Sequence, residues 1–353
     1  MNESVLSTRN LITGYQDKGV APKVVGKYGE LHLRRGEFNV LIGVNGVGKS
    51  TLLKTLSGEI IPLEGEVTIN GQVLNELSNT QRSLLISFVF SNTSIVGKLT
   101  VFETVLMGRY PYVNWWGKLK EEDHRIALDA LKDVGADHLK ERYINTLSDG
   151  ERQKVMIARA IAQNTDVIFL DEPSAHLDLI NRIEIFQLLK SIARKKQKAI
   201  LLSTHEIEMS LQVADNLWIL YDKEVKIGSP SEIVATNFIN QTFSSPSIAF
   251  NAKSGVFNFC ASERLFSFKI SLSQEVENYK GPIDPVIYLE WELKKMISEG
   301  AYIDGNPQFD IILRGMEKEE ALHWEVNFDG KKYTYDLSKC SLFSELMKLY
   351  QLD

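Results

Sequence analysis

The sequence predicts an α/β domain followed by a small α+β domain, and three observations lead to this fold class. Two short apolar runs, Val167–Leu170 and Ala199–Leu202, have the length of buried parallel strands, and a segment of helical spacing separates them. A glycine-rich turn joins the predicted strand Val40–Gly43 to the predicted helix Lys49–Leu56. The last third of the chain has several alternating, strand-like segments and two helical ones, which is typical of an α+β domain.

The other elements of the first domain follow from local patterns. Alternating apolar and polar residues around turn glycines predict short strands in the first forty residues. The helix after the glycine-rich turn stops at Gly58, and Asn70-Gly71 then predicts a hairpin. Residues 92–163 are expected to be mostly helical, and residues 179–196 form a helix whose basic end suits its negative terminus. Ser229 is expected to cap a last short helix.

The second domain is predicted from composition and alternation. Residues 239–353 hold 12 Lys and Arg against 17 Asp and Glu, so most of the net charge of −6 lies there. They also hold 17 of the 33 aromatic residues, and we expect them to fold because solvated acidic tails are poor in aromatics. The predicted strands lie at 247–251, 255–260, 265–270, 308–313, 324–328 and 333–335, and the helices at 284–299 and 342–349.

The boundary between the domains is placed by composition. It follows the helix that Ser229 caps, where the Ser-, Asn-, Thr- and Pro-rich stretch 236–247 begins. The predicted domains are therefore 1–238 and 239–353. The sequence leaves two roles open for the second one, regulation and stabilisation of a dimer.

Composition also excludes several classes of protein. At 24% charged and 44% hydrophobic residues, 353 residues can bury a core, which excludes a disordered or fibrous chain. The net negative charge argues against a nucleic-acid partner, because such proteins present a basic face. Cys260 and Cys340 provide neither a disulfide framework nor a paired metal site. The first residues do not resemble a secretory signal and the longest nearly apolar run is residues 84–90, so we expect a cytosolic protein without a membrane span.

The glycine-rich turn satisfies the phosphate-loop pattern G-x4-G-K-[ST] between a strand and a helix. Its glycines let the backbone fold around phosphates, and the helix that follows directs its positive end at the same anion. Lys49 adds a charge for the β- and γ-phosphates of ATP, and the hydroxyl of Ser50 is a hard ligand suited to Mg²⁺. The expected nucleotide-binding residues are Gly43, Val44, Asn45, Gly46, Val47, Gly48, Lys49, Ser50 and Thr51.

Five further motifs resemble those of the ATP-binding-cassette (ABC) ATPases. Residues 147–151, Leu-Ser-Asp-Gly-Glu, resemble the LSGGQ signature, and Leu170-Asp171-Glu172-Pro173 resembles the Walker B strand. Residues 174–178, Ser-Ala-His-Leu-Asp, resemble the D-loop, and His205 resembles the switch histidine. Tyr15 is similar to the aromatic residue that stacks on adenine. The resemblance covers residues 1–238 and implies a RecA-like core, an antiparallel β subdomain and a helical subdomain.

The resemblance also implies roles for the matched residues. Asp171 would hold Mg²⁺ through water, and Glu172 would position and polarise the water that attacks the γ-phosphate. His205 would hydrogen-bond the γ-phosphate and report its presence. Ser148 and Gly150 would bind the γ-phosphate held by a second subunit, with Asp178 of the D-loop contributing to the nucleotide site. Since one chain carries one cassette, the implied assembly is a homodimer that closes over two ATP.

Two departures from the family pattern affect these expectations. Asp149 and Glu151 replace the second glycine and the glutamine of the signature, and we expect these carboxylates to slow closure rather than abolish function. The Q-loop glutamine should follow Phe90, where Ser91 stands. Ser91 could still carry a water to Mg²⁺, and Asn92 is the other candidate for this role.

Residues 100–123 indicate a branch of the family. The segment around Gly108-Arg109-Tyr110-Pro111 with Trp115 and Trp116 resembles the helical subdomain of ATPases that power uptake of iron-siderophore complexes, haem and cobalamin. Its aromatics suit a groove that receives a partner's helix, or they pack within their own subdomain. The resemblance implies two transmembrane permease subunits, a periplasmic or lipoprotein substrate-binding protein acting indirectly, and a peripheral location on the cytoplasmic face of the inner membrane. The alternative is an ATP-sensing or non-transport ABC protein with weak turnover.

Overall fold

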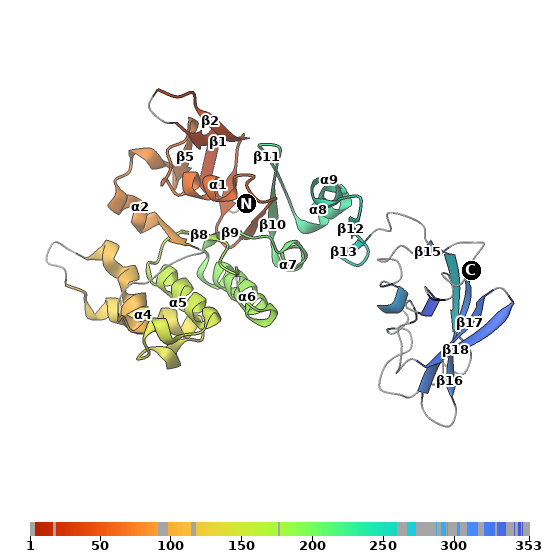
Figure 1. The fold of residues 1–353 in the computed structure, drawn as a ribbon. Coiled ribbons are helices and arrows are strands. Elements are labelled where there is room, and N and C mark those ends of the chain that lie inside the picture. The colour runs from red at the N-terminus through yellow and green to blue at the C-terminus, as the bar shows by residue number, and fades with distance from the viewer. Residues whose placement is uncertain are drawn as a thin grey trace. The chain divides into compact units, whose positions relative to one another are not determined.

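The computed structural model divides into two compact units, Met1–Phe238 and Ile239–Asp353, and each is considered by itself (Figure 1). The structure describes residues 4–16, 19–90, 98–113, 118–175, 177–259, 267–272, 287, 291–293, 295, 302–303, 309–316, 321–328, 330–336, 342, 345–346 and 348.

The first unit is built around a six-stranded sheet in the order β11-β10-β4-β9-β8-β7. Its strands are β4 (Phe38–Ile42), β7 (Ile86–Val89), β8 (Val167–Asp171), β9 (Ala199–Ser203), β10 (Asn216–Tyr221) and β11 (Glu224–Gly228). All neighbours are parallel except β10 and β11. Every residue of β4, β8 and β9 is buried, as expected of parallel strands covered on both faces. The α/β prediction is thus confirmed for this unit.

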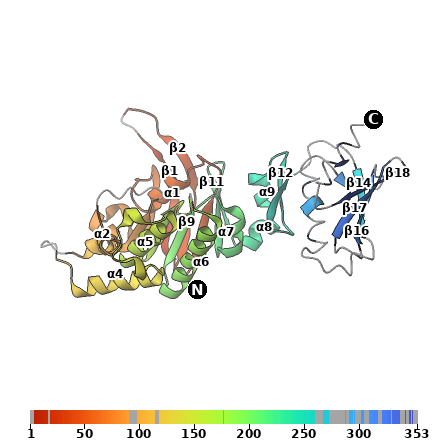
Figure 2. The same cartoon turned by 60° about the horizontal axis from the view of Figure 1, so that its bottom comes forward.

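Helices α1 (Lys49–Leu56) and α6 (Leu179–Lys196) cover opposite faces of this sheet (Figures 1 and 2). Leu41 of β4 shares an apolar core with Leu52 and Leu53 of α1. Phe38 of the same strand meets the ring of Phe186 of α6, with ring centroids 6.1 Å apart. Residues 38 and 41 point to opposite faces because side chains alternate along a strand. Both helices have the predicted bounds.

An antiparallel sheet in the order β2-β1-β5-β6, with β3 also paired to β1, forms a second layer. Its strands are β1 (Ser4–Tyr15), β2 (Lys23–Tyr28), β3 (His32–Arg34), β5 (Glu64–Ile69) and β6 (Gln72–Val73). Asn70 and Gly71 have φ of 47° and 76°, which confirms the predicted hairpin turn. Strands β1 to β4 confirm the strands predicted in the first forty residues, although β1, with 12 residues, is not short. Register shifts after Arg9 and Thr13 interrupt the alternation along β1.

The segment from residue 74 to 162 is largely helical apart from β7 where the structure describes it, and the prediction of mostly helical residues at 92–163 is confirmed within it. It contains α2 (Asn79–Leu85), α3 (Val101–Leu106), α4 (Glu121–Asp133) and α5 (Asp149–Ala162), with short 3₁₀ turns at Leu74–Glu76, Met107–Tyr112, Asp137–Leu139 and Ile144–Thr146. The buried Arg109 joins three of these elements. Its Nε donates to Oδ1 of Asp123 at 2.9 Å and Nη1 donates to the carbonyl of Ala162 at 2.8 Å. A buried guanidinium needs such partners, so this contact fixes how α4 and α5 meet.

The remaining helices of the first unit are α7 (Ile207–Val213) and α8 (Pro230–Ala235), and α9 (Phe238–Phe243) follows at the start of the second unit. Ser229 caps α8 as predicted, since its side chain accepts a hydrogen bond from the backbone of Glu232. α9 was not expected, because it lies in the stretch 236–247, whose Ser, Asn, Thr and Pro content is typical of a loop. The helix buries Ile239, and this packing outweighs a weak local propensity.

The second unit contains a hairpin of β12 (Ile248–Asn251) and β13 (Val256–Phe259) and a five-stranded sheet in the order β15-β14-β16-β17-β18. The sheet strands are β14 (Ser267–Leu272), β15 (Tyr302–Ile303), β16 (Phe309–Met316), β17 (Ala321–Phe328) and β18 (Lys331–Asp336). Phe309, Ile311 and Leu313 pair with Phe328, Val326 and Trp324, which gives one face of the sheet an apolar surface. The two-residue β15 escaped the sequence analysis because so short a strand leaves no readable alternation.

Helical residues are described at 287, 291–293 and 295 and at 342, 345–346 and 348, within the two predicted helices of this unit. Leu342 and Leu346, one turn apart, are fully buried. The second unit is therefore α+β, as predicted.

Candidate nucleotide site

The glycine-rich turn between β4 and α1 requires glycine at specific positions. Gly48 precedes α1 with φ of 111°, and a Cβ there would lie 2.5 Å from Cγ1 of Val25. At Gly43 a Cβ would lie 3.0 Å from the carbonyl oxygen of Leu220 on β10. These distances leave no room for a side chain at either glycine, so the loop packs directly against Val25 and Leu220. The first N–H groups of α1 then lack helical acceptors and suit an anion such as phosphate.

Lys49 is the first residue of α1, and its side chain is only 5% exposed. Its Nζ donates to the carbonyl oxygen of Gly43 at 2.9 Å. Burial lowers the pKa of Lys49, and this effect is opposed by the nearby carboxylates of Glu172 and Asp171, which raise it. Because a partly desolvated ammonium interacts more strongly with an anion than a hydrated one, Lys49 is placed to bind phosphate.

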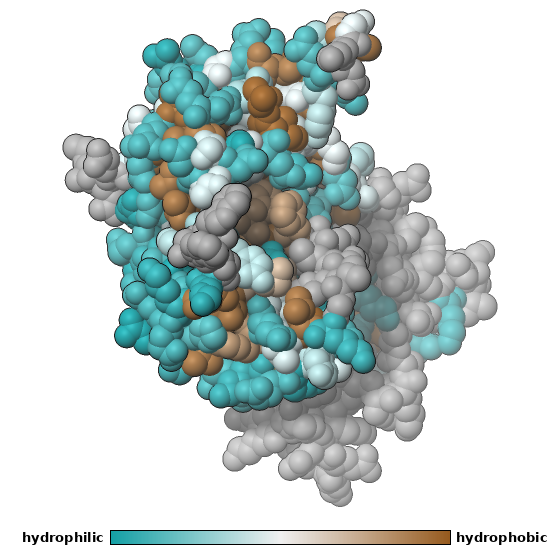
Figure 3. Space-filling model, turned by 90° about the vertical axis from the view of Figure 1, so that its left-hand side faces the viewer, coloured by the Kyte–Doolittle hydropathy of each residue, from teal (hydrophilic) through white to brown (hydrophobic). Residues whose placement is uncertain are grey.

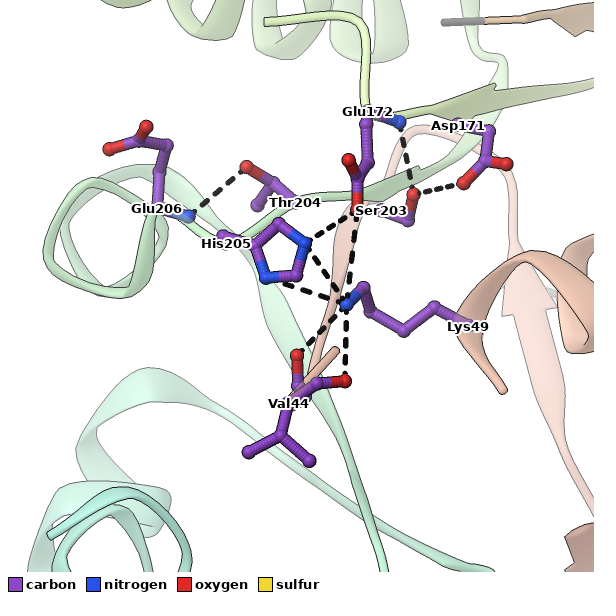
Figure 4. Close-up of polar contacts among 9 residues, drawn as sticks. Val44, Lys49, Asp171, Glu172, Ser203, Thr204, His205 and Glu206 are labelled. Carbon is purple, nitrogen blue, oxygen red and sulfur yellow. Dashed lines mark hydrogen bonds and ion pairs between the residues drawn. The ribbon is translucent and has the colours of Figure 1, made fainter. Parts of the chain in front are cut away.

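Lys49, Glu172 and His205 come together although they belong to three different elements (Figure 4). Nε2 of His205 lies 2.6 Å from Oε1 of Glu172, and Nζ of Lys49 lies 3.9 Å from the same oxygen. Nζ also lies 3.3 Å from Nε2 of His205. Glu172 has φ of 47°, an uncommon conformation for a residue other than glycine or asparagine. The backbone is therefore strained at Glu172, the residue predicted to position the attacking water.

Ser203 connects the two acidic residues at the end of β8. Its hydroxyl donates to Oδ1 of Asp171 at 2.6 Å and accepts from the backbone N–H of Glu172 at 3.0 Å. Ser203 was not among the residues predicted for the site. Its position as the last residue of β9, two residues before His205, was the available signal.

The other predicted residues of the phosphate loop and the adenine site lie at the same edge of the sheet. Tyr15 is half-exposed, and its hydroxyl lies 3.0 Å from Oγ1 of Thr51 on α1. This contact places an aromatic ring beside the phosphate loop, where it remains accessible to a base. The side chains of Val44, Asn45 and Ser50 are exposed, and Gly46 and Val47 lie between them.

The signature residues lie elsewhere in the unit. Ser148 caps α5, and its hydroxyl donates to Oε2 of Glu151 at 2.9 Å while it accepts from the backbone N–H of the same residue. Gly150 packs so closely on α6 that a Cβ would lie 2.5 Å from Oδ1 of Asn181. Asp178 caps α6 by accepting from the backbone N–H of Asn181 at 2.8 Å. Within the described ranges, these contacts are with α5 and α6 and none is with the phosphate loop.

The carboxylate of Glu151 is held at the start of its own helix by Ser148, whose backbone N–H and hydroxyl both donate to it at 2.9 Å. Hydrogen bonds from the backbone and hydroxyl of Ser148 lower the pKa of Glu151. Nη1 of Arg142 lies 3.6 Å from its other oxygen. Glu151 completes a capping box, as a glutamine at this position also would, so the consequence of the replacement is a negative charge near Ser148.

Several predictions fall outside the described residues. These are Ser91 and Asn92 at the Q-loop position, Trp115 and Trp116, the D-loop residue His176 and the two cysteines.

A pocket of about 240 Å³ lies between the end of α1, helix α2 and strand β7. It is lined by Ser57, Gly58, Glu59, Asn79, Arg82, Ser83, Ile86 and Phe88. Arg82 donates to the carbonyl of Gly58 and to the side chain of Asn79, so its guanidinium spans the pocket wall. Figure 3 shows the side of the molecule that carries α2 and α4, where hydrophobic atoms gather in a hollow among hydrophilic ones.

Known protein sequences that resemble this chain belong to the family that these motifs indicate. Residues 28–175 match the family model described as ABC transporter. The chain is 36% identical over 240 residues to an uncharacterized ABC transporter ATP-binding protein of Methanocaldococcus jannaschii, covering 68% of this chain and 81% of the relative. It is 33% identical to a probable siderophore transport system ATP-binding protein of Bacillus subtilis, over 69% of this chain and 87% of the relative. It is 34% identical to the iron(3+)-hydroxamate import ATP-binding protein of the same species, over 67% and 87%.

Solved structures agree with the sequence comparison. The chain resembles an inward-facing putative metal-chelate type ABC transporter with 31% identity and a TM-score of 0.57, covering 65% of this chain and 85% of that one. It also resembles a dimeric bacterial ABC transporter cassette, with 29% identity, a TM-score of 0.56 and coverage of 64% and 98%. The strand order, the phosphate loop and these relatives together identify the chain as a member of the ABC transporter ATP-binding proteins and hence as an ATPase.

Proposed function

We propose that this protein is the ATP-hydrolysing subunit of an importer of metal chelates, of the kind that takes up iron-siderophore complexes, haem or cobalamin. The observation that carries the proposal is the convergence of Lys49, Glu172 and His205 at the phosphate loop. The named activities of two relatives, siderophore transport and iron(3+)-hydroxamate import, support the class of cargo.

Nucleotide binding would use the phosphate loop and Lys49. The N–H groups at the start of α1 and the ammonium of Lys49 belong to the same loop and helix start, and Tyr15 provides an aromatic surface beside them. Asp171 and Ser50 fit a hydrated Mg²⁺, because both offer hard oxygen ligands. The hydrogen bond from Ser203 uses Oδ1 of Asp171, and Oδ2 is the second oxygen to which a cation's water could donate. Bound Mg²⁺ would neutralise charge on the phosphates during transfer.

Hydrolysis would use the pair of Glu172 and His205. The carboxylate of Glu172 can accept a proton from water and so increase its nucleophilicity. His205 holds this carboxylate at 2.6 Å, and its ring can also donate to a phosphate oxygen. Ser203 positions the backbone of Glu172 and the carboxylate of Asp171 together.

A homodimer would complete the site. Ser148 and Gly150 have their contacts with α5 and α6, and in this proposal they face the nucleotide bound by a second copy, together with Asp178. The similarity to a dimeric cassette supports this assembly. A dimer that closes with ATP and opens after hydrolysis would convert nucleotide turnover into motion.

The coupled partners would be two transmembrane permease subunits, with a periplasmic or lipoprotein substrate-binding protein acting indirectly. No helix in the described part of the chain is long and apolar enough to cross a bilayer. We place the subunit at the cytoplasmic face of the inner membrane, with the pocket around Arg82 and Phe88 as the docking position for a permease helix. Its mixture of apolar and charged lining suits the end of an amphipathic helix.

The test is reconstitution with the permease in vesicles. We expect phosphate release that increases when a loaded substrate-binding protein is added, and uptake of the chelate that requires ATP. Lys49→Ala should lose both. Phosphate release without uptake of any iron-siderophore, haem or cobalamin would contradict the importer assignment and leave the ATPase activity in place.

A further inference from the structure

Gln163 follows the last residue of α5, and its side chain reaches a different part of the first unit. Its Nε2 donates to the carbonyl oxygen of Ser83 at 2.7 Å and to that of Ile86 at 3.0 Å. Ser83 lies in the last turn of α2, where carbonyls lack helical donors, and Ile86 is the first residue of β7. The two N–H groups of one carboxamide therefore join the end of α5 to the connection between α2 and β7.

The same end of α5 is also held by the 3₁₀ turn that contains Gly108 and Tyr112. The hydroxyl of Tyr112 donates to the carbonyl of Gln163 at 2.9 Å, and Cζ of Arg109 lies 3.8 Å from the centre of the Tyr112 ring. A Cβ at Gly108 would lie 2.3 Å from the carbonyl oxygen of Arg159, so the turn packs directly on the last turn of α5. Gln163 is thus held by this turn through its main chain and by the α2–β7 connection through its side chain.

Helix α5 connects this contact with the signature. Ser148 caps the N-terminal end of the helix and Gln163 caps the C-terminal end. At about 1.5 Å per residue, the 14 residues of α5 span about 21 Å. Ser83 and Ile86 also line the pocket of about 240 Å³. Since a hydrogen-bonded helix moves as one body, a displacement of the pocket wall that Gln163 follows would also move Ser148.

We propose that Gln163 is a positioning residue that links the occupancy of this pocket to the position of the signature. The proposal rests on the proposed function, in which the pocket receives a permease helix and Ser148 faces a second nucleotide. Across the residues that the structure describes, Gln163 has no hydrogen bond to the phosphate loop, so it acts through α5 rather than on the nucleotide. The Q-loop position holds Ser91 in this chain, whereas Gln163 brings a carboxamide to β7 from a different element.

The test places a stand-in for the partner in the pocket and measures ATP hydrolysis by the full chain. Cys260 and Cys340 are first replaced by serine, and Glu59→Cys then provides the only thiol, at an exposed residue of the pocket wall. The probe is benzyl methanethiosulfonate, which adds a benzyl group to this thiol. We expect modification to change the maximal rate of phosphate release about threefold or more. The ATP concentration for half-maximal rate should change less than about twofold, because the phosphate loop is not displaced.

Gln163→Met keeps the length of the side chain and removes both donors. In this variant we expect the effect of modification to fall below about 1.5-fold, because the pocket wall no longer directs α5. Gln163→Lys restores a donor for the two carbonyls and should regain most of the effect, which packing alone does not predict. The matched control is Gln197→Met, at the glutamine that follows α6 and donates to the carbonyl of Arg194 at 2.8 Å. This control should respond to modification as the parent does.

The possible failures are distinguishable. A parent that hydrolyses no ATP would overturn the proposed function together with this inference. If the parent hydrolyses ATP but does not respond to modification, or if Gln163→Met responds as strongly as the parent, the role of Gln163 alone fails. A response lost equally in Gln163→Met, Gln163→Lys and Gln197→Met would indicate a general loss of rigidity and would likewise overturn the inference.

Discussion

Oε1 of Glu172 and Nε2 of His205 lie 2.6 Å apart, although Glu172 follows β8 and His205 follows β9. These strands are adjacent and parallel, so residues after their carboxyl ends meet at one edge of the sheet. The same edge carries the phosphate loop, because β4 is the other neighbour of β9. One strand order therefore accounts for the placement of all three groups.

Glu172→Gln should remove hydrolysis while ATP still binds. The amide keeps the size of the side chain but cannot accept a proton from water, and a general base typically contributes 10²- to 10⁴-fold. We expect phosphate release to fall by about two to four orders of magnitude, with the affinity for ATP unchanged within about threefold. Glu121→Gln, on the exposed start of α4, is the control. Turnover above a tenth of the original rate would contradict the role of Glu172.

Ser203→Ala should affect Mg²⁺ as well as turnover. The substitution removes the hydroxyl that donates to Asp171 and accepts from the backbone of Glu172. Mutation of a residue that hydrogen-bonds a metal-binding group typically lowers metal affinity or activity 10- to 100-fold. We expect a higher Mg²⁺ concentration for half-maximal phosphate release and a lower maximal rate. Thr204→Ser, at the buried neighbouring residue, is the control. An unchanged Mg²⁺ dependence in Ser203→Ala would refute the role of Ser203 in positioning Asp171.

Glu151→Ala should have two separable effects. It removes the Glu151 half of the capping box of α5, while Ser148 still accepts from the backbone of residue 151, and the loss of a carboxylate at the helix N-terminus costs about 0.3–1 kcal/mol of stability. It also frees the hydroxyl of Ser148 and removes a negative charge beside it, so the dimer should close at a lower ATP concentration. Glu232→Ala breaks an equivalent box at Ser229 and is the matched control. Equal stability losses are expected, with the change in dimer closure confined to Glu151→Ala. Closure that needs more ATP would show that Glu151 assists the signature.

Arg109→Ala should destabilise the helical region strongly. The guanidinium and Asp123 form a buried pair, with side chains 7% and 9% exposed, and removal of one partner leaves the other charge buried. Such a change costs about 3–5 kcal/mol. Lys132→Ala, which removes an exposed pair with Asp129, should cost less than about 1 kcal/mol. Urea denaturation of the two variants measures the difference, and similar midpoints would contradict this account.

Asp166 should contribute stability that depends on pH. A hydrogen bond from Arg35, with further help from Asn70, lowers the pKa of Asp166 in the folded state. A group with a lowered folded pKa stabilises the protein above its unfolded pKa of about 3.9, and this contribution is lost as pH falls through the folded value. Asp166→Asn should therefore reduce stability at about pH 7 and have a smaller effect at about pH 3. Urea midpoints at both pH values give the comparison, with Asp129→Asn as the exposed control. A loss of equal size at both pH values would rule out the ionic contribution.

The sequence determined those features of this protein that depend on neighbouring residues. Helix α6, the cap at Ser229 and the turn at Asn70-Gly71 follow from spacing, capping and turn preferences, which act over a few residues. The motif residues could likewise be recognised one by one, because each occupies a short pattern.

Only the tertiary structure decided which of these residues meet. Ser203 had no local signal strong enough to mark it, yet it joins Asp171 to Glu172 because β8 and β9 are adjacent. Helix α9 and the continuous β1 also depended on burial and on bulges that local alternation does not record. Likewise, the contact of Gln163 with Ser83 and Ile86 follows from how the end of α5 packs beside α2 and β7. The physical reason is that burial and strand pairing are long-range, whereas propensity and capping act locally.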